Sequence, residues 1–328
     1  MNLFTSLKYL IALDDHRHFG RAALASNVTQ PALSNAIRSL EVSYGTAIVK
    51  RGRNFGGFTA EGERILASAR AILREHELLE QDLNSREGDP AGHLLIGAVP
   101  TAMPIAARFA GMLQDRHPRV MPTLRSMSSV ELETRLERMA IDMGLGYTER
   151  TNFTNSPLRA LAQYTEHYFL LRRTSHAGPE SLRIGDPIGW AEAAQLPLCL
   201  LGSEMHNRTI VDRAFASAGV HPRPCIETNS ILTLALSVVA GRVCSVMPGA
   251  LVGTVRGYGG LEALPLTGPE VEVPIAFMVH DSNRPSRALE AALAFAQDPM
   301  WLHEAAQHAG FLGASDPRRM LCAPAVKG

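Results

Sequence analysis

Four polar side chains fall on one face of a helix that the sequence predicts from near Gln30 to Gly45. The apolar residues Leu33, Ile37 and Leu40 follow the i, i+4, i+7 spacing of a buried stripe. The opposite face then carries Gln30, Ser34, Asn35 and Arg38. Amide, hydroxyl and guanidinium groups hydrogen-bond to base edges and phosphates in a major groove, where an α-helix fits. This face suits DNA contact, and it equally suits the solvated side of an ordinary helical hairpin.

The residues around this helix predict how it is positioned. Thr29 suits the N-cap, and Pro31 is tolerated in the first turn because the amide that proline lacks has no partner there. A shorter helix precedes it, joined by a turn at residues 27–28. A first helix at 2–14 is expected to cover both with an inward stripe of Phe4, Leu7 and Ile11.

Residues 4–62 resemble the winged helix-turn-helix of LysR-type transcriptional regulators. The blocks that carry the resemblance are Phe4 through Tyr9, Phe19 to Ala23, Val28 to Ser34, Ile37, Leu40-Glu41, Gly45, Lys50-Arg51 and Thr59 to Gly62. The resemblance implies a DNA-binding surface made of Thr29, Gln30, Pro31, Ser34, Asn35, Arg38, Arg51 and Arg53. Asn35 and Ala36 depart from the commoner Arg and Gln or His at positions that usually help to set the operator sequence.

A basic segment follows the helix-turn-helix. Ile48 to Phe58 contains Arg51, Arg53 and a Gly-Gly pair, which suits a two-stranded wing with a flexible tip. A basic wing beside a recognition helix is expected to meet the DNA backbone or minor groove. The alternative is a solvated hairpin.

The region from Thr59 to Arg86 predicts one long helix without an interrupting proline. Apolar positions recur in steps of 4-3-4-3-4, the heptad pattern of a coiled coil. These positions, here called the seam, are Ile65, Ala69, Ile72, His76, Leu79 and Leu83. The resemblance implies the linker helix that pairs two subunits, in a homodimer or a homotetramer. Packing of the stripe on its own domain is the alternative.

Length and charge are consistent with a regulator of several domains. The chain has 328 residues, 46% of them hydrophobic, and a formal net charge of zero, so it can hold two or three cores. The zero average hides a segregation: residues 17–53 hold six basic residues and one acid, whereas 61–89 hold eight acids and four arginines. Basic charge is concentrated around the helix-turn-helix.

Cysteine usage and hydropathy predict a cytoplasmic protein. The four cysteines are widely spaced, with no pairing at zinc-like intervals, and we expect reduced, mostly buried thiols. Two aspartates at 14–15 argue against a signal peptide. The longest uncharged apolar run, 228–241, is too short to span a bilayer. No membrane partner is expected.

Turn-forming residues at 88–92 predict a hinge, and alternating strands and helices follow it. The order resembles the two-lobed, periplasmic-binding-protein-like effector domain of the LysR family. The predicted fold class is α plus α/β, a winged helix-turn-helix, a linker helix and this effector domain. Predicted boundaries are 1–58 for the DNA-binding domain, 59–87 for the linker, 88–92 for the hinge, 93–160 with 265–298 for lobe 1, 161–264 for lobe 2 and 299–328 for a C-terminal extension.

Short polar residues follow several predicted strands, where helix N-termini present free amides. They are Thr101, Ser128, Ser129, Asn229 and Ser230. Plain helix caps would show the same pattern. The resemblance implies that Thr101, Ser129 and Asn229 match effector-cleft positions, as does the segment 203–208, which includes His206. Tyr147 lies where some members have an arginine, and an organic anion is the default effector.

We find no enzyme motif in the sequence. Gly144-Leu145-Gly146 lacks the third glycine of a dinucleotide fingerprint, and the twelve histidines do not cluster as metal ligands. No catalytic residue, metal or cofactor is predicted. The sequence therefore predicts a transcriptional regulator that binds double-stranded operator DNA under control of a small metabolite, contacting RNA polymerase if it is an activator. The alternatives are a solute-binding protein or enzyme on the α/β lobes, or a constitutive repressor without effector.

Overall fold

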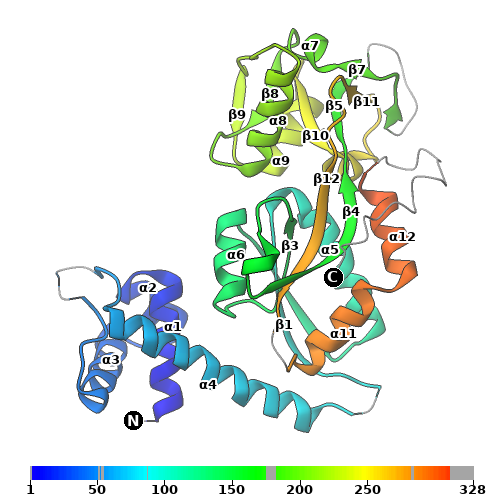
Figure 1. Cartoon of the computed structure of the whole chain (residues 1–328). Helices are drawn as coiled ribbons and strands as arrows, with labels where there is room; N and C mark the ends of the chain where they lie inside the picture. The colour runs from blue at the N-terminus through cyan, green and yellow to red at the C-terminus, as the bar shows by residue number, and fades with distance from the viewer. Residues whose placement is uncertain are drawn as a thin grey trace.

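Three parts follow one another along the chain: a helical N-terminal domain, one long helix and two α/β lobes stacked end to end (Figure 1). The computed structural model describes residues 2–50, 52, 55–86, 88–174, 182–281 and 284–310. Lobe 1 lies beside the long helix, and lobe 2 lies beyond lobe 1. This architecture agrees with the predicted fold class.

The N-terminal domain begins with α1 (Leu3–His16), α2 (Phe19–Ala25) and α3 (Gln30–Tyr44). As predicted, Thr29 caps α3, because its hydroxyl accepts a hydrogen bond from the backbone N–H of Ala32. Gly45 ends α3 in the left-handed conformation, with φ 65°. The three apolar stripe residues of α3 are buried, so the predicted periodicity of this helix is confirmed.

The inward face of α1 differs from the prediction. Leu7, Leu10 and Leu13 are buried, whereas Phe4 is 38% exposed and Ile11 is only half-buried. The helices α2, α3 and α4 all pack against α1, and together they select a face that the spacing of apolar residues alone does not define. Phe4 projects beyond that core.

The wing is small in the part of the chain that the structure describes. One antiparallel bridge joins Val49 to Phe58, and the N–H of Lys50 donates to the carbonyl of Gly57. Arg51 and Arg53 lie outside the described residues. Of the predicted two-stranded wing, the structure thus describes the base.

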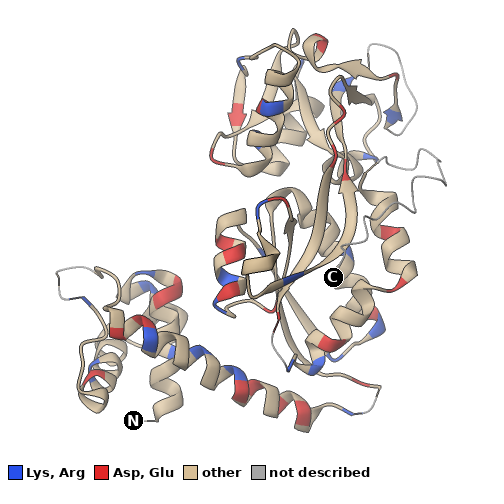
Figure 2. Ribbon diagram, in the orientation of Figure 1, with Lys and Arg blue, Asp and Glu red and all other residues tan. Residues whose placement is uncertain are grey.

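The long helix α4 (Ala60–Asn84) is capped by the Thr59 hydroxyl, which accepts from the Gly62 N–H at 2.9 Å. It ends two residues before the predicted Arg86, where the chain enters the turn at the hinge. Its acidic residues lie in the first turn and in the C-terminal half, and its arginines lie between these two groups (Figure 2).

Lobe 1 is built on a five-stranded sheet of order β2-β1-β3-β12-β4. Its strands are β1 (Gly92–Ala98), β2 (Val120–Ser126), β3 (Met143–Tyr147), β4 (Leu158–Glu166) and β12 (Val273–His280). The first three are parallel, and β12 runs antiparallel to β3 and β4. On one face lie α5 (Met103–Arg116), α11 (Arg287–Ala296) and α12 (Pro299–His308). On the other face α6 (Ser129–Glu137) contacts β3 and β12.

Lobe 2 contains a second sheet with the order β6-β11-β5-β10-β8-β9, and β7 pairs with β11. The strands are β5 (Tyr168–Arg173), β6 (Arg183–Ile184), β7 (Ile188–Gly189), β8 (Leu198–Leu201), β9 (Ile226–Thr228), β10 (Cys244–Pro248) and β11 (Leu261–Thr267). The helices are α7 (Trp190–Ala193), α8 (His206–Ser217), α9 (Ile231–Ala240) and α10 (Gly249–Val252). Two connections, β4 to β5 and β11 to β12, join the lobes.

Two predicted lobe boundaries fall inside strands and are corrected by the sheet pairing. The boundary at 160/161 cuts β4, which pairs with β12 of lobe 1 as far as Glu166. The boundary at 264/265 cuts β11, which belongs to the lobe 2 sheet as far as Thr267. An apolar strand pattern does not specify which sheet the strand joins, so these limits depend on long-range pairing.

The start of the predicted C-terminal extension belongs structurally to lobe 1. Trp301 of α12 is fully buried, and its indole N–H donates to Gln163 Oε1 at 2.6 Å. Residues 311–328 lie outside the described part of the chain. Within the described ranges, none of the helices combines the length and the apolar character needed to cross a membrane.

Candidate functional site

The outer face of α3 is open to solvent. Gln30, Asn35 and Arg38 are exposed and Ser34 is half-buried. Thr29 and Pro31 are also exposed, at the start of the helix. These side chains present donors and acceptors of the kind that bind base edges and phosphates.

The acid of α3 does not share that open surface. Glu41 is half-buried, and its Oε1 accepts hydrogen bonds from the backbone N–H groups of Ile48 at 2.8 Å and Val49 at 3.2 Å. The carboxylate therefore fixes the base of the wing against α3. This arrangement removes a negative charge from the surface that would meet phosphates.

One of the two residues that depart from the LysR-type pattern, Ala36, cannot contact DNA directly. Ala36 is fully buried, so only its neighbour Asn35 reaches the surface. The difference follows from helix geometry, because Ala36 lies beside Leu33 and Ile37 on the core side.

The seam on α4 divides into two parts. Ala69 is fully buried within its own subunit, which corrects its prediction as a contact to a partner, and Ile65 is half-buried against the core of the N-terminal domain. Ile72, Leu79 and Leu83 are 41%, 55% and 76% exposed. The C-terminal part of the seam is thus an unpaired apolar surface on the described chain.

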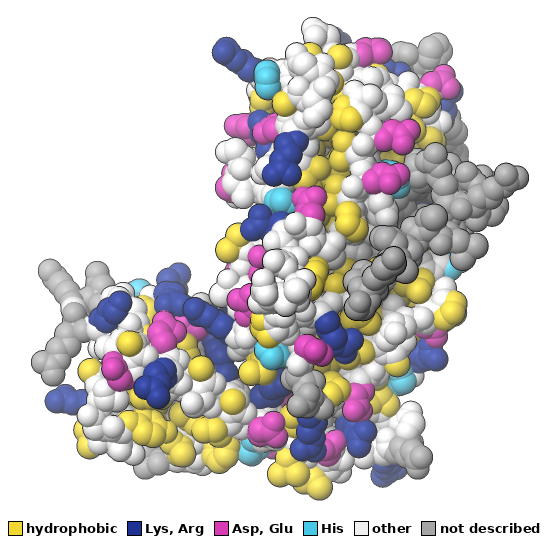
Figure 3. Space-filling view, in the orientation of Figure 1, with side chains coloured by type: hydrophobic (Ala, Val, Ile, Leu, Met, Phe, Trp, Pro, Cys, Tyr) yellow, Lys and Arg dark blue, Asp and Glu magenta, His cyan; other side chains and the backbone are white. Residues whose placement is uncertain are grey.

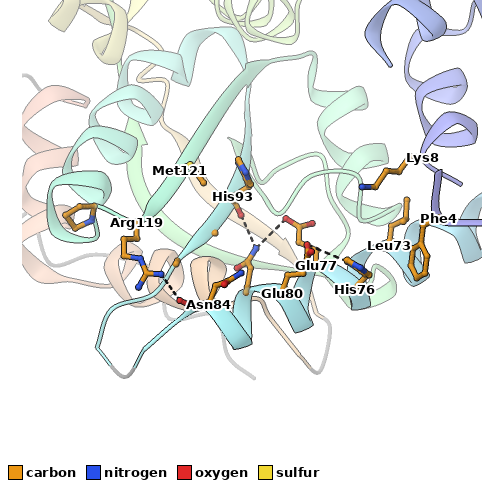
Figure 4. A pocket seen from close by; sticks show the side chains of 14 residues that line it. Phe4, Lys8, Leu73, His76, Glu77, Glu80, Asn84, His93, Arg119 and Met121 are labelled. Carbon is orange, nitrogen blue, oxygen red and sulfur yellow. Dashed lines mark hydrogen bonds and ion pairs between the residues drawn. The ribbon is translucent and has the colours of Figure 1, made fainter. Parts of the chain in front are cut away.

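A groove of about 760 Å³ lies beside this exposed part of the seam, between α1, α4 and the base of lobe 1 (Figure 4). Phe4 and His76 form one wall, with ring centroids 5.0 Å apart. His76 also lies 3.5 Å from Glu80. On the lobe 1 side, Gln81 donates to the carbonyl of His93 at 3.3 Å.

Four polar side chains from both lobes meet at the junction between the lobes. Thr101 follows β1 and its hydroxyl lies 2.7 Å from that of Tyr147, at the end of β3. Asn207 of α8 donates to Tyr147 at 3.3 Å and to Tyr168 of β5 at 2.8 Å. We call these four residues the interlobe cluster. All four are buried.

The interlobe cluster is neutral at physiological pH. Burial raises the pKa of Tyr147 to about 12, against the hydrogen bonds from Thr101 and Asn207. Burial also raises the pKa of Tyr168 well above its usual value. Both phenols therefore remain protonated and can donate or accept hydrogen bonds.

An ionisable pair borders this cluster. His206 Nε2 lies 2.9 Å from Glu149 Oε1, and the His206 ring packs edge-on against Tyr147 with centroids 4.9 Å apart. The nearby Arg208 already binds Asp212 and Glu227. In Figure 3, apolar side chains reach the surface between the lobes, flanked by charged and histidine side chains.

The predicted effector residues are only partly brought together. Thr101, Tyr147 and His206 lie in or beside the interlobe cluster. Ser128 and Ser230 serve as N-caps of α6 and α9, accepting from Glu131 and Thr233. Ser129 is buried at the start of α6, and Asn229 is exposed.

Sequence reasoning missed Tyr168 and Glu149. The available indication for Tyr168 was its hydroxyl, at the first position of the apolar run that forms β5. Asn207 fell within the predicted segment 203–208 without being singled out. Glu149 gave no sequence pattern, because its partner His206 is distant along the chain.

The thiols in the described part of the chain are free. Cys199 and Cys244 are buried, and burial raises the pKa of both. Cys225 is exposed and its thiol donates to the carbonyl of Leu198 at 3.4 Å. Cys322 lies outside the described residues. Across the described ranges, no group of three or more His, Cys, Asp or Glu side chains is arranged to hold a metal ion.

Comparison with known families finds two matches that together cover most of the chain. Residues 4–63 match the family described as bacterial regulatory helix-turn-helix protein, lysR family. Residues 87–301 match the LysR substrate binding domain.

Two similar curated proteins match nearly their whole length. The hydrogen peroxide-inducible genes activator of Haemophilus influenzae is 29% identical, over 86% of this chain and 91% of its own. The DNA-binding transcriptional dual regulator OxyR of Escherichia coli is 27% identical, over 88% of this chain and 92% of its own.

Solved structures share the fold. A full-length OxyR variant from Pseudomonas aeruginosa superposes with a TM-score of 0.64 and 23% identity, covering 90% of this chain and 98% of its own. Full-length CbnR in complex with its target DNA has a TM-score of 0.61 and 21% identity, covering 93% of this chain and all of its own.

Proposed function

The chain belongs to the LysR family of DNA-binding transcriptional regulators, and we propose that α3 reads its operator through Gln30, Ser34, Asn35 and Arg38. Thr29 and Pro31 at the start of α3 approach the DNA backbone, and Arg51 and Arg53 of the wing add phosphate contacts. DNA binding by this chain is supported by its relatives, since CbnR has been solved with its target DNA and the OxyR relative is named a DNA-binding transcriptional regulator.

The observation that carries this proposal is the open face of α3. Gln30, Asn35 and Arg38 are exposed, whereas Glu41 is turned into the base of the wing. The face therefore offers donors and acceptors without a carboxylate to repel phosphates.

Selection of DNA from a random pool by the full-length protein tests the proposal. We expect one enriched motif with two related half-sites, protected in footprinting, and an Arg38→Ala variant that binds it at least about tenfold more weakly. Selection of no motif, or unchanged binding by the variant, would count against the assignment.

We also propose that the effector is a small molecule that binds between the lobes. Thr101, Tyr147 and His206 support this position, because they come from both lobes and meet at the junction. Ser128, Ser129, Asn229 and Ser230 complete the proposed cleft on α6 and α9. An organic anion is the first class to test, since hydroxyl and amide donors suit carboxylate oxygens.

A thermal-shift screen of small organic acids and inorganic anions on the full-length protein tests this part. A true effector raises the melting temperature progressively once its concentration exceeds the dissociation constant. Thr101→Val should then weaken its binding roughly threefold to tenfold. Undiminished binding to that variant would put the pocket elsewhere.

Assembly through the second half of α4 is the third part of the proposal. Ile72, Leu79 and Leu83 suit a partner subunit because they are apolar and exposed, and His76 of the same seam lines the open groove of about 760 Å³. A partner's α4 would fill that groove with apolar side chains. Measurements of molecular mass in solution distinguish a homodimer from a homotetramer. If the protein activates transcription, we expect it also to contact RNA polymerase.

Two relatives are named for genes that hydrogen peroxide induces, but we do not propose that the buried thiols of this chain sense peroxide. Thiolate is the reactive form of cysteine, and a raised pKa disfavours it. The burial and the raised pKa of Cys199 and Cys244 therefore argue against oxidation of these two thiols as the regulatory input.

A further inference from the structure

The helix α6 of lobe 1 lies between lobe 2 and the N-terminal domain of the same subunit (Figure 1). Its first residue, Ser129, belongs to the proposed cleft, and Arg135 near its end contacts α1. We infer that α6 is the element that couples the lobes to the DNA-binding domain. This inference rests on the proposed function, since it supposes that the cleft senses and that α3 binds DNA.

The helix α6 packs closely against the sheet of lobe 1. Leu132 of α6 is fully buried over three strand glycines, Gly97, Gly144 and Gly146. A Cβ atom at any of these positions would lie 2.7–2.8 Å from a Leu132 methyl group. The two glycines of β3 thus provide room for α6, and because the helix is closely packed we expect it to move as one body.

At its cleft side, α6 is connected to lobe 2 through two consecutive residues. Glu149 contacts His206 of lobe 2 at 2.9 Å, and the adjacent Arg150 donates to Glu133 of α6 at 3.2 Å. His206 is largely buried, with 12% of its side chain exposed. Separation of the lobes must therefore break the His206–Glu149 contact or displace the segment that holds Glu133.

At its other side, α6 contacts the N-terminal domain through arginines. Arg135 donates to Asp15 of α1 at 3.3 Å, and Arg138, just after α6, lies 4.0 Å from Asp14. Asp14 is buried and also accepts from Arg70 of α4 at 2.8 Å. Movement of α6 is thus transmitted to α1 and α4 together, and α1 packs directly against α3.

A double-mutant cycle on the full-length protein tests the coupling. His206→Ala releases the lobe 2 side, and the double substitution Arg135→Gln with Arg138→Gln releases the α1 side. The readouts are hydrogen exchange of α1 amides and affinity for the DNA fragment that the parent protein selects from a random pool. Arg108→Gln is the matched control, because it breaks an exposed ion pair with Glu304 on the opposite face of lobe 1.

We expect His206→Ala to change the exchange rates of α1 by about threefold in the parent and in the Arg108→Gln background. The same substitution should have no effect on α1 in the Arg135→Gln, Arg138→Gln background. Equal effects in all backgrounds, or α1 exchange that is insensitive to His206→Ala, would overturn the inference. Failure to select any DNA would instead overturn the proposed function, while the exchange cycle would still decide the coupling.

Discussion

The outer face of α3 and the interlobe cluster differ in how far their polar groups already have partners. On α3, Gln30 and Asn35 are exposed to solvent. Between the lobes, Thr101, Tyr147 and Asn207 are buried and hydrogen-bonded to one another. The first surface is ready to bind, whereas the second is closed by its own contacts.

The two sites therefore differ in the interactions that a ligand must displace when it binds. DNA can bind to α3 after displacing only water and counterions. A ligand between the lobes must replace the bonds of the interlobe cluster, and each such exchange contributes only about 0.5–1.5 kcal/mol net. We therefore expect effector binding to be accompanied by movement of the lobes, which is what a regulatory site requires.

The largest expected effect concerns assembly, on which operator binding by α3 depends. Ile72→Glu places a charge in the seam, where burial without a partner costs roughly 3–5 kcal/mol. Because Ile72 is 41% exposed in the subunit, the subunit itself should still fold. Sedimentation should show smaller species, with operator affinity reduced more than about a hundredfold.

Met300→Glu is the control for this substitution, since Met300 is a 58% exposed apolar residue on α12 of lobe 1. It should leave both the oligomer and operator affinity unchanged. An unchanged oligomer in the Ile72→Glu protein would mean that the seam serves its own subunit only.

The next effect concerns pH and the junction of the lobes. Glu166, at the end of β4, is buried, and burial raises its pKa to about 8 despite hydrogen bonds from backbone N–H groups such as that of Ala250. A carboxyl whose pKa is raised on folding stabilises the protein fully below its usual pKa near 4.5, and this contribution is lost as pH rises toward 8. The free energy of unfolding should thus fall by roughly 2–3 kcal/mol between pH 6 and 8.

Tryptophan fluorescence can follow this unfolding, because both tryptophans, Trp190 and Trp301, are buried in the lobes. Glu166→Gln should flatten the pH dependence. Asp298→Asn should preserve it, because the pKa of Asp298 is lowered by Arg116 and this residue titrates only in acid. Equal slopes in the parent and Glu166→Gln proteins would exclude Glu166 as the cause.

A smaller effect separates base contacts from phosphate contacts on the open surface. Asn35→Ala should change which base is preferred in the operator, at a cost of about 1–2 kcal/mol for the parent motif. Arg51→Ala should weaken binding to all sequences and reduce the slope of affinity against salt by about one. Salt titrations on selected and scrambled DNA measure both, and identical profiles for the two variants would contradict the division.

The two regions were also unequally predictable from sequence. Local rules sufficed for α3, because the Thr29 cap, the apolar spacing and the Gly45 end all lie between residues 29 and 45. The interlobe cluster depends on β3, β5 and α8 meeting in space, so Tyr168 could not be placed. Heptad spacing alone does not distinguish contacts to a partner from contacts within the domain, because Ala69 satisfies the spacing and yet packs on its own domain.

Removal of one hydroxyl from each region gives the most direct test of the comparison. Tyr147→Phe deletes the hydroxyl that joins Thr101 to Asn207, and leaves buried polar groups without that partner. The free energy of unfolding of the lobes should fall by about 1 kcal/mol. Ser34→Ala removes a half-buried hydroxyl from α3 and should change this free energy by less than about 0.5 kcal/mol, while altering the preferred operator bases. If Tyr147→Phe is as stable as the parent, the interlobe hydroxyls are not held closed by one another, and a ligand could enter the cleft without moving the lobes.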